Sequence, residues 1–252
     1  MSNSSLVSYT KISPNRTSPR NHKIDTVSIH CAVGQFTAKE LLNLSHFVKY
    51  NANSGSSCNY AIGHDGSIGM GVEEKDRSWC TSSRSNDHRA ITIEVASDKK
   101  HPYKVTDKAY DALIDLLVDI CKRNNIKELK WEADKSLIGK PDKQNMTVHR
   151  WFANKDCPGE YLYSRHGQIA SEVNARLKTN KNKTFEPYKV EVKITTLNIR
   201  KGPGTNYART GKFTGKGTFT IVAESKGKGS DKGWGKLKSG AGWISLDFAT
   251  KK

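Results

Sequence analysis

The sequence feature that most constrains the fold is the order of strand-like and helix-like runs. This order changes once along the chain, from mixed runs to strand-like runs alone. Between residues 26 and 177, short runs with strand-like alternation are interleaved with longer runs of helical spacing. Such interleaving is typical of an α/β layer structure. After residue 188 the runs are short, rich in β-forming residues and separated by glycine-rich turns. We therefore predict a central mixed β-sheet flanked by helices, followed by a small all-β barrel or sandwich.

A polar segment separates the two regions. Residues 179–187 read TNKNKTFEP, have little apolar surface to bury and end in proline, as linkers do. The sequence thus predicts one domain over residues 1–178, a linker over residues 179–187 and a second domain over residues 188–252.

Charge and composition limit the function classes. The chain has 42 Lys and Arg against 25 Asp and Glu, a formal charge of +17. Sixteen of the basic and five of the acidic residues fall in residues 179–252, which gives this region a net charge of +11. Such a surface attracts anionic polymers. Zinc-finger spacing, RNP-type aromatic motifs and basic helices are missing from the sequence, so nothing beyond charge supports specific nucleic-acid binding.

The sequence also bears on membrane insertion, secretion and the redox state of the compartment. An uninterrupted apolar run of about 18 residues, which a membrane span needs, does not occur. The first residues lack the basic and apolar regions of a secretory signal. The five cysteines form no CxxC pair and are odd in number, which argues against a full disulfide framework. We expect synthesis in a reducing cytoplasm.

Three segments carry residues suited to hydrolytic chemistry. In TVSIHCAV, period-2 alternation turns His30 away from the apolar face, and in ITIEVA the same rule separates Glu94 from the isoleucines. The segment VHRWFANKDCPG then supplies His149, Lys155 and Cys157. Two imidazoles and one thiolate suit zinc and leave a fourth position for water. Each residue alone also fits an ordinary core, surface or ion-pair role, so the residues by themselves leave the zinc site open.

Together these segments resemble the zinc-dependent type 2 N-acetylmuramoyl-L-alanine amidases, which include phage endolysins, bacterial autolysins and animal peptidoglycan-recognition proteins. The resemblance covers roughly residues 20–178 and includes NYAIGHDGSI with its Asp-Gly turn. It implies that His30, His149 and Cys157 bind Zn²⁺. It further implies that Glu94 is the general base and that Lys155 stabilises the oxyanion. The implied reaction is hydrolysis of the amide between N-acetylmuramic acid and L-alanine.

One position departs from the family pattern. Some members use a tyrosine in the strand before the Asp-Gly turn, and counting back places Cys58 there instead. Tyr60 lies two residues further on and is expected on the same strand face, so it remains an additional candidate. For His64, His88 and Cys80 we expect structural or surface roles.

Residues 188–252 resemble the bacterial SH3 (SH3b) domain, on the stretch LNIRKGPGTNY and the later pairing of GW with GWI. The resemblance implies an SH3-like barrel that binds cell-wall peptidoglycan. Tyr207, Trp234 and Trp243 are candidates to line its binding groove, although tryptophan in so small a barrel is as often part of the core. The positive charge gives a separate reason to expect affinity for anionic wall polymers.

We therefore expect a phage endolysin that is made in the host cytoplasm, is released by a holin and acts on the cell wall. A cellular autolysin with the same chemistry is one alternative. A recognition protein that binds peptidoglycan without cutting it is another, and Cys157 argues against it.

Overall fold

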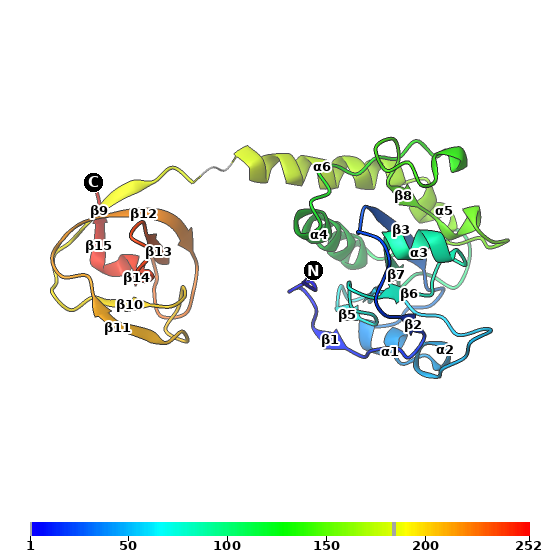
Figure 1. The fold of residues 1–252 in the computed structure, drawn as a ribbon, viewed down its shortest axis with the longest axis horizontal. Coiled ribbons are helices and arrows are strands. Elements are labelled where there is room, and N and C mark those ends of the chain that lie inside the picture. The colour runs from blue at the N-terminus through cyan, green and yellow to red at the C-terminus, as the bar shows by residue number, and fades with distance from the viewer. Residues whose placement is uncertain (1, 183–184) are drawn as a thin grey trace. The chain divides into compact units, whose positions relative to one another are not determined.

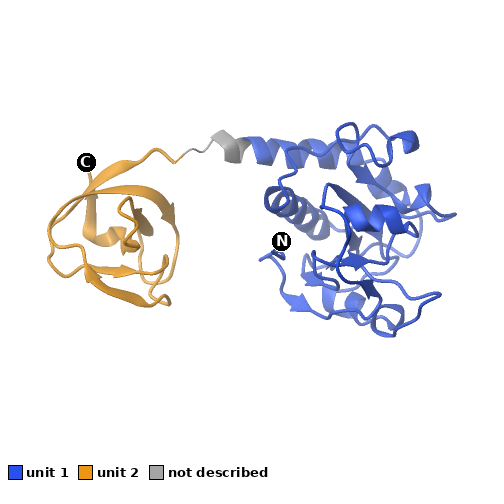
Figure 2. Ribbon diagram, viewed as in Figure 1, with its two compact units in different colours: residues 1–180 blue, residues 181–252 orange. Residues whose placement is uncertain are grey.

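The structure is a computed structural model that describes residues 2–182 and 185–252, without the side chains of residues 179–184. It divides into two compact units, residues 1–180 and 181–252 (Figure 2). Residues 183–184 of the predicted linker lie outside the described residues. The linker's residues 179–182 are helical, because helix α6 spans His166–Asn182 and meets neither glycine nor proline there.

A six-stranded mixed sheet organises the first unit, as the interleaved runs predict (Figure 1). Its centre is the parallel pair β3 and β7, and β8 pairs in parallel with the other side of β3. On the far side of β7, β4 pairs in parallel with β7 and β5 runs antiparallel to β4. The order is β1 (Tyr9–Thr10), β5 (Ile68–Met70), β4 (Tyr60–Ile62), β7 (Ala90–Val95), β3 (Thr26–Cys31) and β8 (Met146–Thr147). A separate ribbon joins β2 (Arg16–Thr17) to β6 (Arg77–Ser78).

The starts of α1 (Ala38–Leu42) and α4 (Asp107–Arg123) follow capping residues in the sequence. Thr37 and Glu40 form a capping box at α1, with Glu40 N donating to Thr37 Oγ1 at 3.2 Å. Thr106 caps α4 by accepting from Ala109 N at 3.1 Å. Residues 37–50 fold as two short helices rather than one. The helices are α1 (Ala38–Leu42), α2 (Ser45–Val48), α3 (Arg84–Arg89), α4 (Asp107–Arg123), α5 (Gly159–Tyr163) and α6, with 3-10 turns η1 (Lys135–Leu137) and η2 (His149–Trp151).

The two faces of the sheet meet different surroundings. One face packs on α4 and α6 in a single buried cluster that includes Ile29, Ile93, Leu117 and Val173. A second cluster, formed by α1, α2 and β4, lies beside the other face. All six residues of β3 are buried, including the polar residues of that second face. The fold therefore holds polar side chains of β3 out of solvent, where an unpaired polar group is costly.

The second unit is a seven-stranded sheet whose described strand pairs are all antiparallel, and it has its own buried core. Val190, Ile199, Ile221 and Ile244 are among the core residues. The order is β11 (Arg209–Phe213), β10 (Asn198–Arg200), β14 (Trp243–Ser245), β13 (Trp234–Leu237), β12 (Gly217–Ser225), β9 (Tyr188–Val192) and β15 (Ala249–Lys251), with the 3-10 turn η3 (Leu246–Phe248). Within the described part of the chain, the helices are all too short or too polar to cross a membrane.

Candidate metal centre and catalytic cleft

Strands β3 and β7 place His30 beside Glu94. The two residues are directly paired in the parallel register, and both side chains lie on the face away from α4 and α6. His30 Nδ1 lies 3.8 Å from Glu94 Oε1, and the His30 side chain has no exposed surface. The central strands thus hold an imidazole and a carboxyl next to each other on rigid backbone.

The segment after β8 brings two further residues to His30. It is closed by a hydrogen bond from Arg150 N to Cys157 O at 3.1 Å, and the Arg150 guanidinium donates to Asp156 O at 2.8 Å. Cys157 Sγ lies 3.3 Å from His30 Nδ1, and the rings of His30 and His149 are 5.2 Å apart. The ligand atoms of His30, His149 and Cys157 all lie within 4.8 Å of one another.

The chemistry of this donor set fits a divalent cation such as zinc. Burial lowers the pKa of His30 to about 3, with His149 and His166 adding to the effect, and burial also lowers the pKa of His149. Both imidazoles are therefore neutral near pH 7, the state in which they bind a metal. The contact with Cys31 and burial hold the pKa of the Cys157 thiol well above its usual range. A bound cation would offset that cost by stabilising the thiolate.

Glu94 places a carboxyl group beside this cluster, 3.8 Å from His30 Nδ1. Burial raises its pKa to about 7. Its Oε1 lies 3.8 Å from Cys80 Sγ, and its Oε2 is buried without a hydrogen-bond partner among the described residues. Cys80, for which a structural or surface role is expected, therefore lies at the centre. With His30 and Glu94 it forms a second group of potential ligand atoms within 4.8 Å.

A cleft of about 660 Å³ opens onto these residues, with Glu94, His149 and Lys155 among those that line it. Lys155 is exposed, and its charge adds to the lowering of the His149 pKa. Arg77 and Arg84 also line the cleft, so its wall carries three cationic side chains. The aromatic residues in the lining are Phe47 and Trp79.

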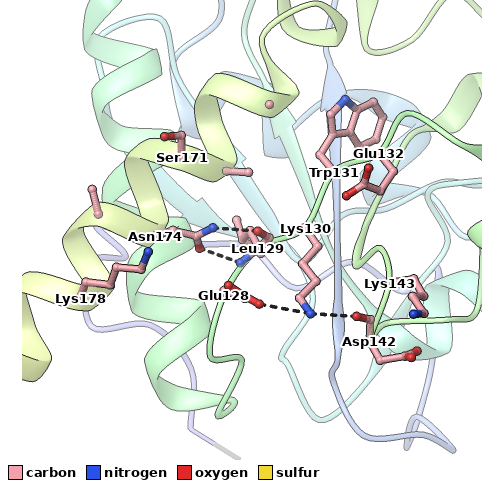
Figure 3. Close-up of a pocket in the computed structure, with 13 residues that line it drawn as sticks. Glu128, Leu129, Lys130, Trp131, Glu132, Asp142, Lys143, Ser171, Asn174 and Lys178 are labelled. Atoms are coloured by element: carbon pink, nitrogen blue, oxygen red, sulfur yellow. Dashed lines mark hydrogen bonds and ion pairs between the residues drawn. The ribbon is translucent and has the colours of Figure 1, made fainter.

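A larger cavity of about 740 Å³ lies elsewhere, between residues 128–132 and α6 (Figure 3). Its polar groups bind one another: the Asn174 side chain accepts from Leu129 N at 2.7 Å and donates to Leu129 O at 2.8 Å. Lys130 Nζ lies 3.2 Å from Glu128 Oε1 and donates to Asp142 O at 2.8 Å. Since none of the predicted site residues is among the described residues that line it, we place the chemistry in the smaller cleft.

Tyr60 lies away from the cleft. It belongs to the core that includes α4, whereas Cys58 packs in the cluster with α1 and α2, so the expectation of a shared face is wrong. The Tyr60 hydroxyl donates to Glu74 Oε1 at 2.6 Å and accepts from Ser4 N at 3.0 Å. The reason is that β4 begins at Tyr60, so Cys58 lies before the strand, where period-2 alternation does not apply.

Two serines that the sequence analysis did not single out contact the histidines. Ser28 Oγ lies 3.3 Å from His30 Nε2, and Ser82 Oγ lies 2.9 Å from His149 Nε2. Ser28 is two residues before His30 on one strand, so period-2 alternation already places it on the same face. Ser82 lies 67 residues from His149, and no local pattern links the two.

The three aromatic candidates of the second unit differ in exposure. Tyr207 is 44% exposed and Trp234 is 3% exposed, while Trp243 is half-buried. Trp234 lines a cavity of about 190 Å³ together with Arg200 and Phe248. Its indole nitrogen has no hydrogen-bond partner in the described part of the chain.

Several solved structures are each similar to about two thirds of the chain. PlyL is 17% identical with a TM-score of 0.48, over 66% of this chain and 95% of that one. The N-acetylmuramoyl-L-alanine amidase LysC from Clostridium intestinale URNW is 17% identical with a TM-score of 0.45, over 68% and 96%. A selenomethionine derivative of AmpD is 18% identical with a TM-score of 0.48, over 66% and 96%. No curated protein matches the chain.

The family model described as N-acetylmuramoyl-L-alanine amidase matches residues 20–160. The matched range includes β3, β7 and the segment from His149 to Cys157. Because this match spans more than half of the chain, the protein belongs to the N-acetylmuramoyl-L-alanine amidase family of hydrolases.

Proposed function

We propose that this chain is a zinc-dependent endolysin that cleaves the amide between N-acetylmuramic acid and L-alanine in bacterial peptidoglycan. The observation that carries the proposal is the convergence of His30, His149 and Cys157, with ligand atoms within 4.8 Å, at a cleft lined by Glu94. Membership of the N-acetylmuramoyl-L-alanine amidase family indicates peptidoglycan as the substrate. A chain that only recognises peptidoglycan needs neither a complete set of nitrogen and sulfur ligands nor a buried carboxyl beside it.

Each residue at the cleft has a distinct role in the proposed reaction. His30, His149 and Cys157 would hold the zinc, which when bound lowers the pKa of water and polarises a carbonyl. Glu94, with a pKa raised to about 7 by burial, accepts the proton of the attacking water and returns it to the leaving amine. Lys155, on the wall of the cleft, offsets the negative charge that develops on the carbonyl oxygen.

The test uses purified Gram-positive cell walls and the full chain. Turbidity, new amino-terminal alanine and new reducing sugar are followed for the zinc-loaded protein, for EDTA-treated protein and after zinc is added back. Cys157→Ala is compared with Cys121→Ala, because Cys121 is fully buried in the α4 core and its loss tests only packing.

The expected result is new amino-terminal alanine without new reducing sugar, abolished by EDTA, restored by zinc and lost in Cys157→Ala. Cys121→Ala, measured below its unfolding temperature, should keep the activity. Sedimentation of the chain with walls, without alanine release at any zinc concentration, would contradict the enzymatic proposal and favour a recognition protein.

For the second unit we propose wall binding by an SH3b-type barrel. The all-β fold, the concentration of positive charge and the exposed ring of Tyr207 support this role. Tyr207→Ala in the full chain should lower the fraction that sediments with walls. Phe213→Ala is the matched control, because Phe213 is 54% exposed and also aromatic. Equal loss in both variants, or in neither, would argue against a specific role for Tyr207.

A further inference from the structure

Each histidine at the metal centre turns its Nε2 toward a serine hydroxyl, but the two serines are not equivalent. Ser28 lies on β3 without exposed surface, and its hydroxyl also donates to Thr147 O at 3.1 Å. Ser82 is exposed, and its hydroxyl has no second hydrogen-bond partner in the described part of the chain. Only Ser28 therefore has its single hydroxyl hydrogen committed elsewhere.

The count of hydrogens decides which nitrogen of His30 carries the proton. A carbonyl oxygen cannot donate, so the contact with Thr147 uses the hydrogen of Ser28. The remaining contact, from Ser28 Oγ to His30 Nε2 at 3.3 Å, is a hydrogen bond only if Nε2 donates. A neutral imidazole protonated at Nε2 has its lone pair on Nδ1. That nitrogen faces Cys157 Sγ at 3.3 Å and Glu94 Oε1 at 3.8 Å.

We propose that Ser28 is a positioning residue that holds His30 in the Nε2-protonated tautomer and so presents the Nδ1 lone pair to the metal. Backbone pairing makes this arrangement rigid, because Ser28 and Thr147 are register partners in the parallel β3–β8 pair. The acceptor that orients Ser28 is thus a strand carbonyl rather than a mobile side chain. The inference rests on the zinc site proposed above and extends it to a residue outside the ligand set.

Ligand orientation of this kind changes metal affinity by about 10- to 100-fold in other metalloproteins. The test therefore measures the zinc dissociation constant of the full chain by competition with a chromogenic chelator. Ser28→Ala should weaken zinc binding about 10- to 100-fold, and Ser28→Thr, which keeps the hydroxyl, should restore most of the affinity. Ser82→Ala should have a smaller effect. Unfolding midpoints of the zinc-free variants separate a loss of zinc binding from a loss of folding.

A second measurement needs no variant. Long-range ¹H–¹⁵N correlation spectra of the zinc-free wild-type chain, with labelled histidine, report which nitrogen of His30 is protonated. Protonation at Nε2 supports the proposal. Protonation at Nδ1, zinc affinity unchanged in a folded Ser28→Ala variant, or absence of zinc binding by the wild-type chain would each overturn it. If zinc binds as described but no alanine is released from walls, the proposed enzyme function fails while the role of Ser28 stands.

Discussion

Asp87 gives the sharpest stability prediction, because a single buried carboxylate fixes the loop beside the cleft. It is 2% exposed and accepts from Cys80 N at 3.0 Å, from Thr81 N at 3.2 Å and from the Thr81 hydroxyl at 2.6 Å. Asp87→Ala leaves the buried Thr81 amide and the partly buried Cys80 amide without an acceptor, at about 1–3 kcal/mol each. The Thr81 hydroxyl keeps another acceptor in Ser83 O, so the loss of its bond to Asp87 adds little to this cost. The free energy of unfolding should fall by about 4 kcal/mol.

Urea unfolding of the zinc-free chain, followed by tryptophan fluorescence, measures this loss. With a slope of about 2 kcal/mol/M, the midpoint of the first unit should move by about 2 M. Asp65→Ala is the matched control: Asp65 accepts from Ser67 N at 3.1 Å in an exposed turn, where water can replace the lost acceptor. A loss below about 1 kcal/mol for Asp87→Ala, or equal losses in the two variants, would refute the reasoning.

Three further outcomes follow from the same contacts. Glu94→Gln keeps the shape of the side chain but cannot take a proton, so alanine release should fall about 10²- to 10⁴-fold while sedimentation with walls is unchanged; unchanged release would remove Glu94 from the mechanism. Burial raises the pKa of Asp87 from 3.8 to about 6, so the folded chain binds this proton more tightly than the unfolded chain. This tighter proton binding adds at most about 3 kcal/mol to the free energy of unfolding. The added stability is complete below about pH 4 and is lost as pH rises through about 6. The pH dependence of unfolding of Asp87→Asn should lack this change. Raising salt from about 0.1 M to about 1 M shortens the Debye length from about 10 Å to about 3 Å, so the fraction of chain sedimenting with walls should decrease if charge drives binding.

Strand periodicity was sufficient to find the side chains on the central strands. The mixed sheet is confirmed, and alternation along β3 and β7 correctly separates His30 and Glu94 from the apolar face that packs on α4. The same rule is wrong for Tyr60, because it was extended back to Cys58, which precedes β4. Alternation is therefore informative within a strand and uninformative beyond its ends.

The sequence did not predict which residues far apart in the chain contact one another at the cleft. Cys80 and Ser82 come to the cleft on a loop whose conformation depends on the buried Asp87, and no spacing in the sequence records that dependence. The sequence also did not predict that Trp234 is buried, since a tryptophan in a glycine-rich strand can line a groove or pack in a core. Its low exposure makes it a poorer surface candidate than Tyr207.

The contact between Cys157 and His30 joins positions 127 residues apart. A cation bound there would act as a removable cross-link that closes most of the first unit into one loop. Binding confined to the folded state adds about 4 kcal/mol of stability when the free cation is about 1,000 times its dissociation constant. On the ribosome, the cross-link cannot close until residue 157 has emerged. A chain that ends between residues 149 and 156 would therefore hold both histidines without the thiolate, and the proposed site would be complete only when nearly the whole first unit is made.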